Sequence, residues 1–114
     1  MKRPIIVCLC GSTKFKDEFT KQQLQETLNG KIVLTIGCSL KSDVDIFGHL
    51  SERELYNIKR KLDKLHFAKI ELADEVLILN VGGYIGVSTY DELNYARALD
   101  KKVRFLEPCV DRDI

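Results

Sequence analysis

Two neighbouring carboxylates are the strongest candidates for chemistry in this sequence. Glu92 follows Asp91 in the first turn of a helix predicted over 88–100, where the positive end of the helix dipole favours an ionised carboxylate. A carboxylate held in this state beside a sugar can act as a nucleophile or stabilise an oxocarbenium-like centre. A structural role competes with this one, because Thr89-x-x-Glu92 has the spacing of a helix capping box and Ser88-x-x-Asp91 resembles one.

Two glycine-bearing turns, at 11–13 and 82–86, each follow a predicted strand and lead into a predicted helix. Free backbone N–H groups and the helix dipole suit such turns to bind an anion such as phosphate. The alternative is that the glycines only permit tight turns and the nearby hydroxyl groups only cap helices. Neither turn has the pattern of a P-loop or of a Rossmann dinucleotide site, so those classes are not supported. The hydroxyl groups beside the turns belong to Ser12, Thr13, Ser88 and Thr89.

Strands and helices alternate along the chain. Apolar runs predict the strands, and apolar side chains at helical spacing predict the helices. This alternation favours one α/β domain over residues 1–114, with a mainly parallel sheet of four or five strands. The two turns then share the carboxyl edge of the sheet, where ligands of such folds bind. The predicted strands are 4–10, 31–37, 74–80 and 102–106, and the predicted helices are 14–29, 51–72 and 88–100.

Two of the predicted helices carry an apolar stripe that we expect to face the core. The second helix also begins with a capping box, formed by Ser51 and Glu54. The stripe residues are Phe15, Phe19, Leu24 and Leu28 in the first helix, and Leu55, Ile58, Leu62 and Leu65 in the second.

Composition narrows the classes of function. The 114 residues carry a formal net charge of +1, so nothing draws the chain as a whole to bulk nucleic acid or to an anionic membrane. No apolar stretch approaches the roughly 18 residues of a spanning helix, and the first residues lack the pattern of a signal peptide. We therefore expect a cytoplasmic protein. A domain this small buries a limited share of its surface, which favours subunit pairing.

The four cysteines are expected to remain thiols, because the cytosol is reducing. Cys8 and Cys10 share one face of a predicted strand and are poorly placed for a mutual disulfide, so we interpret them as small buried hydrophobic side chains. No pair among the cysteines, His49 and His66 has C-x-x-C or helical i, i+4 spacing, and no metal site is predicted. His66 is expected to cap or pack, or to protonate a leaving base.

Five segments carry a family resemblance: CGSTKFK at 10–16, ADEV at 73–76, GGYIGVST at 82–89, EL-x-YA at 92–96 and K-x-V at 101–103. Together they resemble the nucleoside 2-deoxyribosyltransferase-like superfamily, which includes 2'-deoxynucleoside 5'-phosphate N-hydrolases. The matching segments follow the family order over nearly the whole chain. Only the predicted loop at 38–50 contains no matching segment. It implies a flavodoxin-like three-layer α/β sandwich that assembles as a homodimer or larger homo-oligomer, with sites completed across the interface.

The resemblance also implies an activity. The N-glycosidic bond of a nucleoside or nucleoside 5'-monophosphate is cleaved, or its sugar is transferred, with Glu92 attacking the anomeric carbon to give a glycosyl-enzyme. Asp91 or His66 aids the sugar or the base, and no cofactor is needed because a positioned carboxylate and a leaving base suffice. The residues expected to bind the substrate or its phosphate are Gly11, Ser12, Thr13, Lys14, Gly83, Tyr84, Gly86, Ser88 and Thr89.

Two positions depart from the family pattern. Many relatives carry a tyrosine near the end of the first strand that orients the glutamate, where this chain has Cys8, a poor donor, so Tyr95 or Tyr90 would have to replace it. Relatives also often have an aspartate in the helix before the third strand, where the alignment reaches His66, with Asp63 as a displaced candidate. A second interpretation therefore stays open, in which the chain is a nucleotide-binding or sensing module and the glutamate only caps its helix.

Overall fold

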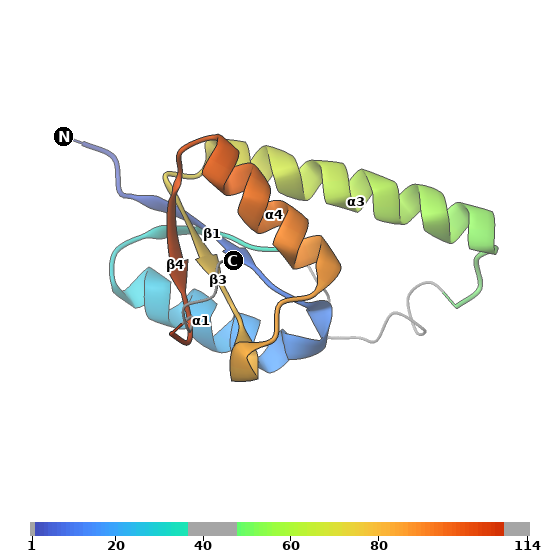
Figure 1. Ribbon diagram of the computed structural model, residues 1–114, viewed down its shortest axis with the longest axis horizontal. Coiled ribbons are helices and arrows are strands. Elements are labelled where there is room, and N and C mark those ends of the chain that lie inside the picture. Colours follow the sequence, from blue (N-terminus) through green and yellow to red (C-terminus); the bar gives the residue numbers. More distant parts are fainter. Residues whose placement is uncertain (1, 37–47, 109–114) are drawn as a thin grey trace.

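A computed structural model describes residues 2–36 and 48–108, and these hold four strands in one sheet. The strand order is β2-β1-β3-β4, and each neighbouring pair is parallel (Figure 1). The parallel α/β sheet predicted from the alternation of strands and helices is confirmed. The strands are β1 (Ile6–Cys10), β2 (Ile32–Leu34), β3 (Glu75–Ile78) and β4 (Lys102–Phe105).

Three helices cover the two faces of the sheet in the described chain. Figure 1 shows α3 and α4 on one face and α1 on the other, which gives the flavodoxin-like three-layer arrangement that the resemblance implied. No helix within the described ranges is both long and apolar enough to cross a membrane. The helices are α1 (Lys16–Leu28), α3 (Glu52–Leu72) and α4 (Val87–Ala98), and short 3-10 turns span Thr13–Phe15 and Val81–Gly83.

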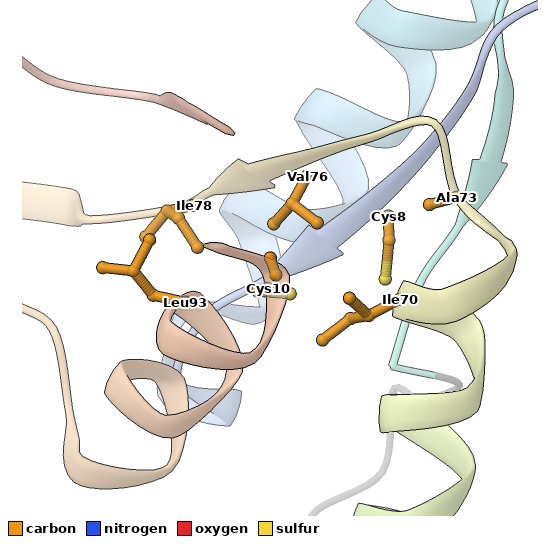
Figure 2. Packing of buried hydrophobic residues seen from close by; sticks show 8 residues of the cluster. Cys8, Cys10, Ile70, Ala73, Val76, Ile78 and Leu93 are labelled. Carbon is orange, nitrogen blue, oxygen red and sulfur yellow. The ribbon is translucent and has the colours of Figure 1, made fainter. Parts of the chain in front are cut away.

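Two apolar clusters hold the three layers together. Successive side chains of a strand point to opposite faces, so β1 sends Val7 and Leu9 toward α1, while Cys8 and Cys10 point toward α3 and α4. Full burial of each large aliphatic side chain stabilises the fold by about 1.5–3 kcal/mol. The cluster beneath α3 and α4, drawn in Figure 2, consists of Cys8, Cys10, Ile70, Ala73, Val76, Ile78, Leu93 and Ala96.

The start of α3 confirms the predicted capping box. The Glu54 backbone N–H donates to Ser51 Oγ at 3.1 Å, and the Ser51 backbone N–H donates to the Glu54 carboxylate at 3.0 Å. Two amide groups that the helix leaves without partners are satisfied in this way, and an N-cap side chain of this kind stabilises a helix by about 1 kcal/mol.

The predicted apolar stripe of α1 is wrong toward its carboxyl end. Phe19 is buried as expected, but Leu24 and Leu28 are 60% and 71% exposed. The buried side chain in this part of the helix is Glu26, whose carboxylate pairs with Arg104 of β4. Glu26 follows Phe19 by seven residues and so lies on the same face of the helix, whereas Leu28, nine residues after Phe19, lies on the opposite face.

The predicted stripe of α3 is displaced as well. Leu62 and Leu65 are exposed, whereas His66 and Ile70 are buried. Figure 1 shows the first turns of α3 reaching well past the sheet, so that the carboxyl half of the helix makes the packing contacts. The buried face of α3 therefore includes a histidine that the sequence pattern did not place in the core.

A cluster of buried charges links the amino ends of β3 and β4 to the connection after α1. The side chain of Glu75 is 3% exposed and lies 2.8 Å from Lys31 Nζ and 3.2 Å from Arg104 Nε. Glu26 pairs with the same two cations. These contacts pull the pKa of Glu75 below its usual value even though burial acts to raise it.

Candidate active site

Glu92 lies deeper in its helix than the sequence indicated. α4 begins at Val87, one residue earlier than predicted, and its N-cap residue is Gly86, which makes no side-chain cap. Glu92 is therefore in the second turn, where the helix dipole acts more weakly than in the first. Neither predicted capping box forms, so the assignment of Glu92 as a helix cap is wrong.

The Glu92 carboxylate faces α3. Its side chain is 13% exposed, and its Oε1 lies 3.7 Å from Nε2 of the buried His66. The Oε1 atom is itself buried and has no hydrogen-bond partner among the described residues. Asp63 stands nearly one turn before His66 on α3, and its negative charge also acts on Glu92. The structure thus brings together Glu92, His66 and the displaced aspartate candidate.

Burial controls the ionisation of Glu92. Loss of hydration raises the pKa of Glu92 to about 7, and the nearby negative charges of Cys8 and Asp63 act in the same direction. The charge of His66 and the thiol of Cys10 oppose this rise in part. A carboxyl group with a pKa near neutrality exists in both forms there, so it can hold a proton or act as a carboxylate.

Two thiols complete the surroundings of His66. Its Nε2 lies 3.8 Å from Cys8 Sγ and 3.3 Å from Cys10 Sγ. Figure 2 shows both cysteine side chains leaving β1 on the side of α3 and α4. Both are free and buried, as predicted; Cys38 and Cys109 lie outside the described residues. The sequence interpretation of Cys8 and Cys10 as apolar fillers missed their contact with an imidazole, for which β1 alone carries no signal.

The thiols and the imidazole share protons. The Cys10 thiol donates to Cys8, which, together with His66, lowers the pKa of Cys8 to about 6 despite burial. The same bond and burial raise the pKa of Cys10 above its usual value. Burial alone would lower the pKa of His66, but Cys8 and Glu92 outweigh it and raise that pKa. These opposite shifts favour a proton on His66 and the loss of one from Cys8.

The first glycine turn follows β1 directly. A side chain on Gly11 would meet Leu79 Cβ at 3.1 Å, so a larger residue there would push its neighbour back by a few tenths of an ångström. Ser12 accepts a hydrogen bond from the Lys14 backbone N–H at 3.3 Å and caps the short 3-10 turn. Thr13 and Lys14 are exposed. Ser12 thus has a structural partner, while its neighbours present their side chains to the solvent.

The second glycine turn meets the first through an aromatic ring. Lys14 Nζ lies 3.7 Å from the centre of the Tyr84 ring, and Phe15 packs edge-on against the same ring. Gly83 has a φ of +84°, a conformation that favours glycine. A side chain on Gly86 would lie 3.1 Å from the Tyr84 hydroxyl. The predicted convergence of the two turns at one edge of the sheet is therefore present.

The remaining predicted site residues divide by exposure. Ser88 and Asp91 are exposed, whereas Thr89 is buried. The hydroxyl of Tyr95 donates to the carboxylate of Glu71, so the prediction that Tyr95 orients the glutamate is wrong. Tyr90, the other candidate, is exposed.

The fold is a parallel α/β sheet with a buried carboxyl group at its carboxyl edge, and that edge is where ligands of open α/β sheets generally bind. Neither a protein-family model nor a curated protein matches this chain. The function must therefore be argued from the chemistry of the site.

Proposed function

We propose that this protein cleaves the N-glycosidic bond of a nucleoside, preferably a nucleoside 5'-monophosphate, and passes the sugar to water or to another base. The observation that carries the proposal is the position of Glu92: a nearly buried carboxyl group, with an unpartnered Oε1, next to Cys10 at the end of β1. The turn that follows Cys10 begins with Gly11 and Ser12, so the carboxyl group and a candidate phosphate site are neighbours along the same strand end.

The proposed reaction proceeds in two displacements. The ionised Glu92 oxygen attacks the anomeric carbon, the bond from that carbon to the base nitrogen breaks, and the base leaves with its bonding electrons. Water or an acceptor base then attacks the glycosyl-enzyme and restores the carboxylate. His66 supports this role because it lies 3.7 Å from Glu92, and its raised pKa favours a proton on the imidazole. That proton stabilises the carboxylate and is available for the departing base. Asp91 would contact the sugar from the exposed side of α4.

The two glycine turns supply the proposed phosphate subsite. Lys14 gives a positive charge beside the exposed Tyr84 ring, and Thr13 and Ser88 add exposed hydroxyl donors. Tyr84 then offers an aromatic surface close to the same subsite. This combination favours a phosphorylated substrate over a free nucleoside.

A homodimer or larger homo-oligomer in the cytoplasm is part of the proposal. Large apolar side chains remain exposed along α3, at Tyr56, Leu62 and Leu65. Covering them in an assembly would remove apolar surface from water and add to the small core.

The decisive experiment is chromatographic detection of free base after the protein is incubated with a panel of ribo- and deoxyribonucleosides and their 5'-monophosphates. Wild type and Glu52→Gln should release base, whereas Glu92→Gln should not. Glu52 is an exposed glutamate at the start of α3 and serves as the matched control. The proposal fails if no base appears from any substrate, with or without an acceptor base. Nucleotide binding without base release would instead favour the sensing module.

A further inference from the structure

Three side chains that commonly bind metals meet in the buried layer between β1 and α3. The Sγ atoms of Cys8 and Cys10 and a ring nitrogen of His66 all lie within 4.8 Å of one another. All three residues are buried. The proposed glycosidic reaction uses His66 but leaves both thiols without a role.

We infer that Cys8, Cys10 and His66 bind one zinc ion, with the Glu92 carboxylate as the fourth ligand. Zinc prefers four ligands in a tetrahedron, with sulfur at about 2.3 Å and imidazole nitrogen at about 2.0–2.1 Å. Those lengths place a sulfur and a nitrogen ligand about 3.6 Å apart. The two separations from His66 Nε2 are 3.8 Å to Cys8 and 3.3 Å to Cys10, on either side of that value.

The Glu92 carboxylate is the proposed fourth ligand. An imidazole nitrogen and a carboxylate oxygen on the same zinc ion lie about 3.3 Å apart. The Glu92 Oε1 is 3.7 Å from the same nitrogen and has no other hydrogen-bond partner among the described residues. Glu92 lies outside the group of donor atoms that are within 4.8 Å of one another, so its side chain must turn toward the ion to become a ligand. Coordination would satisfy a buried oxygen that otherwise has no partner.

The surrounding charges suit a dication. Two thiolates, a neutral imidazole and a carboxylate around Zn²⁺ leave one net negative charge, and the positive charge of Lys69 acts on both Cys8 and His66. The Lys69 ammonium is held in place by the Thr35 carbonyl at 2.6 Å. On binding, zinc replaces whatever protons the thiols and the imidazole still carry, and these pass to the solvent.

The donor set selects zinc over the common hard cations. Magnesium and calcium require cages built of oxygen ligands, whereas thiolate and imidazole bind zinc well. This inference does not depend on the proposed glycosidic activity. A Glu92 oxygen that coordinates zinc cannot attack a sugar at the same time, so the two uses of the residue exclude each other.

The test uses the reduced 114-residue chain with Cys38→Ser and Cys109→Ser, so that Cys8 and Cys10 are its only thiols. Cobalt is added first because it is a coloured substitute for zinc. One equivalent should give the strong visible bands of tetrahedral Co²⁺ and a thiolate-to-cobalt charge-transfer band, and zinc should abolish both. His66→Gln should weaken zinc binding at least about 100-fold, because even residues that only support a ligand change affinity 10–100-fold. His49→Gln replaces an exposed histidine and should have no effect.

X-ray absorption on the zinc-loaded protein tests the same ligand set without any change in the cluster. Two sulfur scatterers at about 2.3 Å and two nitrogen or oxygen scatterers are expected. A shell of nitrogen and oxygen alone would overturn the inference, as would a folded His66→Gln protein that binds zinc with undiminished affinity. Failure of cobalt to produce a charge-transfer band would also overturn it. None of these measurements involves a nucleotide, so their outcome is separate from that of the base-release assay.

Discussion

His66 Nε2 and Glu92 Oε1 lie 3.7 Å apart across the contact between α3 and α4. Each residue sits on a different helix, and the two helices pack against each other and against the same face of the sheet (Figure 1). Glu92 is the carboxyl group that the sequence identified as a catalytic candidate. His66 is the histidine for which the sequence left several roles open. β1 supplies the two thiols, of Cys8 and Cys10, that lie next to His66 Nε2.

Replacing Glu92 with glutamine should lower the rate of base release by roughly four orders of magnitude or more, because a catalytic nucleophile is lost. The melting temperature should stay the same or rise, since an amide avoids the cost of burying a charge. Thermal unfolding followed by circular dichroism checks this second part. A clear loss of stability would indicate a structural role that the geometry of α4 does not show.

Replacing His66 with glutamine should reduce kcat by about 10²–10⁴-fold, the usual contribution of a positioned acid or base. KM should change little, because the phosphate-binding turns are untouched. Steady-state kinetics beside His49→Gln provide the comparison. Equal losses in the two variants would remove His66 from the reaction.

Replacing Lys14 with methionine should raise KM for nucleoside 5'-monophosphates by about tenfold, which corresponds to about 1.4 kcal/mol of lost binding. KM for the matching free nucleosides should not change. Lys61→Met, on the exposed face of α3, is the control. If both classes of substrate were affected alike, Lys14 would not be binding the phosphate.

Zinc should inhibit base release in the wild-type protein, and a chelator should restore it, because coordinated Glu92 is not free to react. Cys10→Ala should retain activity in the presence of zinc, since one ligand is missing. Initial rates at increasing zinc concentration measure both effects. Zinc binding that leaves the rate unchanged would place the ion away from the Glu92 carboxylate.

The buried charge cluster at Glu75 should make stability depend on pH. The pKa of Glu75 is lower in the folded chain than the unfolded value, so its stabilising contribution is complete above the unfolded pKa and is lost as pH falls through the folded pKa. Urea unfolding from neutral pH down to about pH 3 should show this loss, and Glu75→Gln should show a shallower dependence. Arg104→Met leaves the buried Glu26 and Glu75 carboxylates with less compensating positive charge. It should lower the free energy of unfolding by about 3 kcal/mol at neutral pH.

Local sequence signals determined the framework of this fold. Apolar runs such as 4–10 located the strands, because a strand buried on both faces of a parallel sheet is apolar throughout. The Ser51–Glu54 capping box placed the start of α3, since its hydrogen bonds involve only residues three apart. The alternation of elements then implied that both glycine turns lie at one edge, which the contact between Lys14 and Tyr84 bears out.

Tertiary packing decided which side chains of each element are buried and which of them meet. Leu24 and Leu28 stay exposed because they lie five and nine residues after Phe19, away from its buried face, and the residue that shares that face is Glu26. The exposure of Leu65 beside a buried His66 likewise depends on how α3 lies across β1.

The candidate site shows the same division. Glu92 was identified from its own segment, but its neutral-range pKa and its contact with His66 arise from burial between two helices. Cys8 and Cys10 carry no local sign of a polar role, because a small thiol in a strand is chemically ambiguous until its neighbours are known. Periodicity is a property of one element, whereas a reactive cluster requires side chains from three elements at distances that only their packing sets.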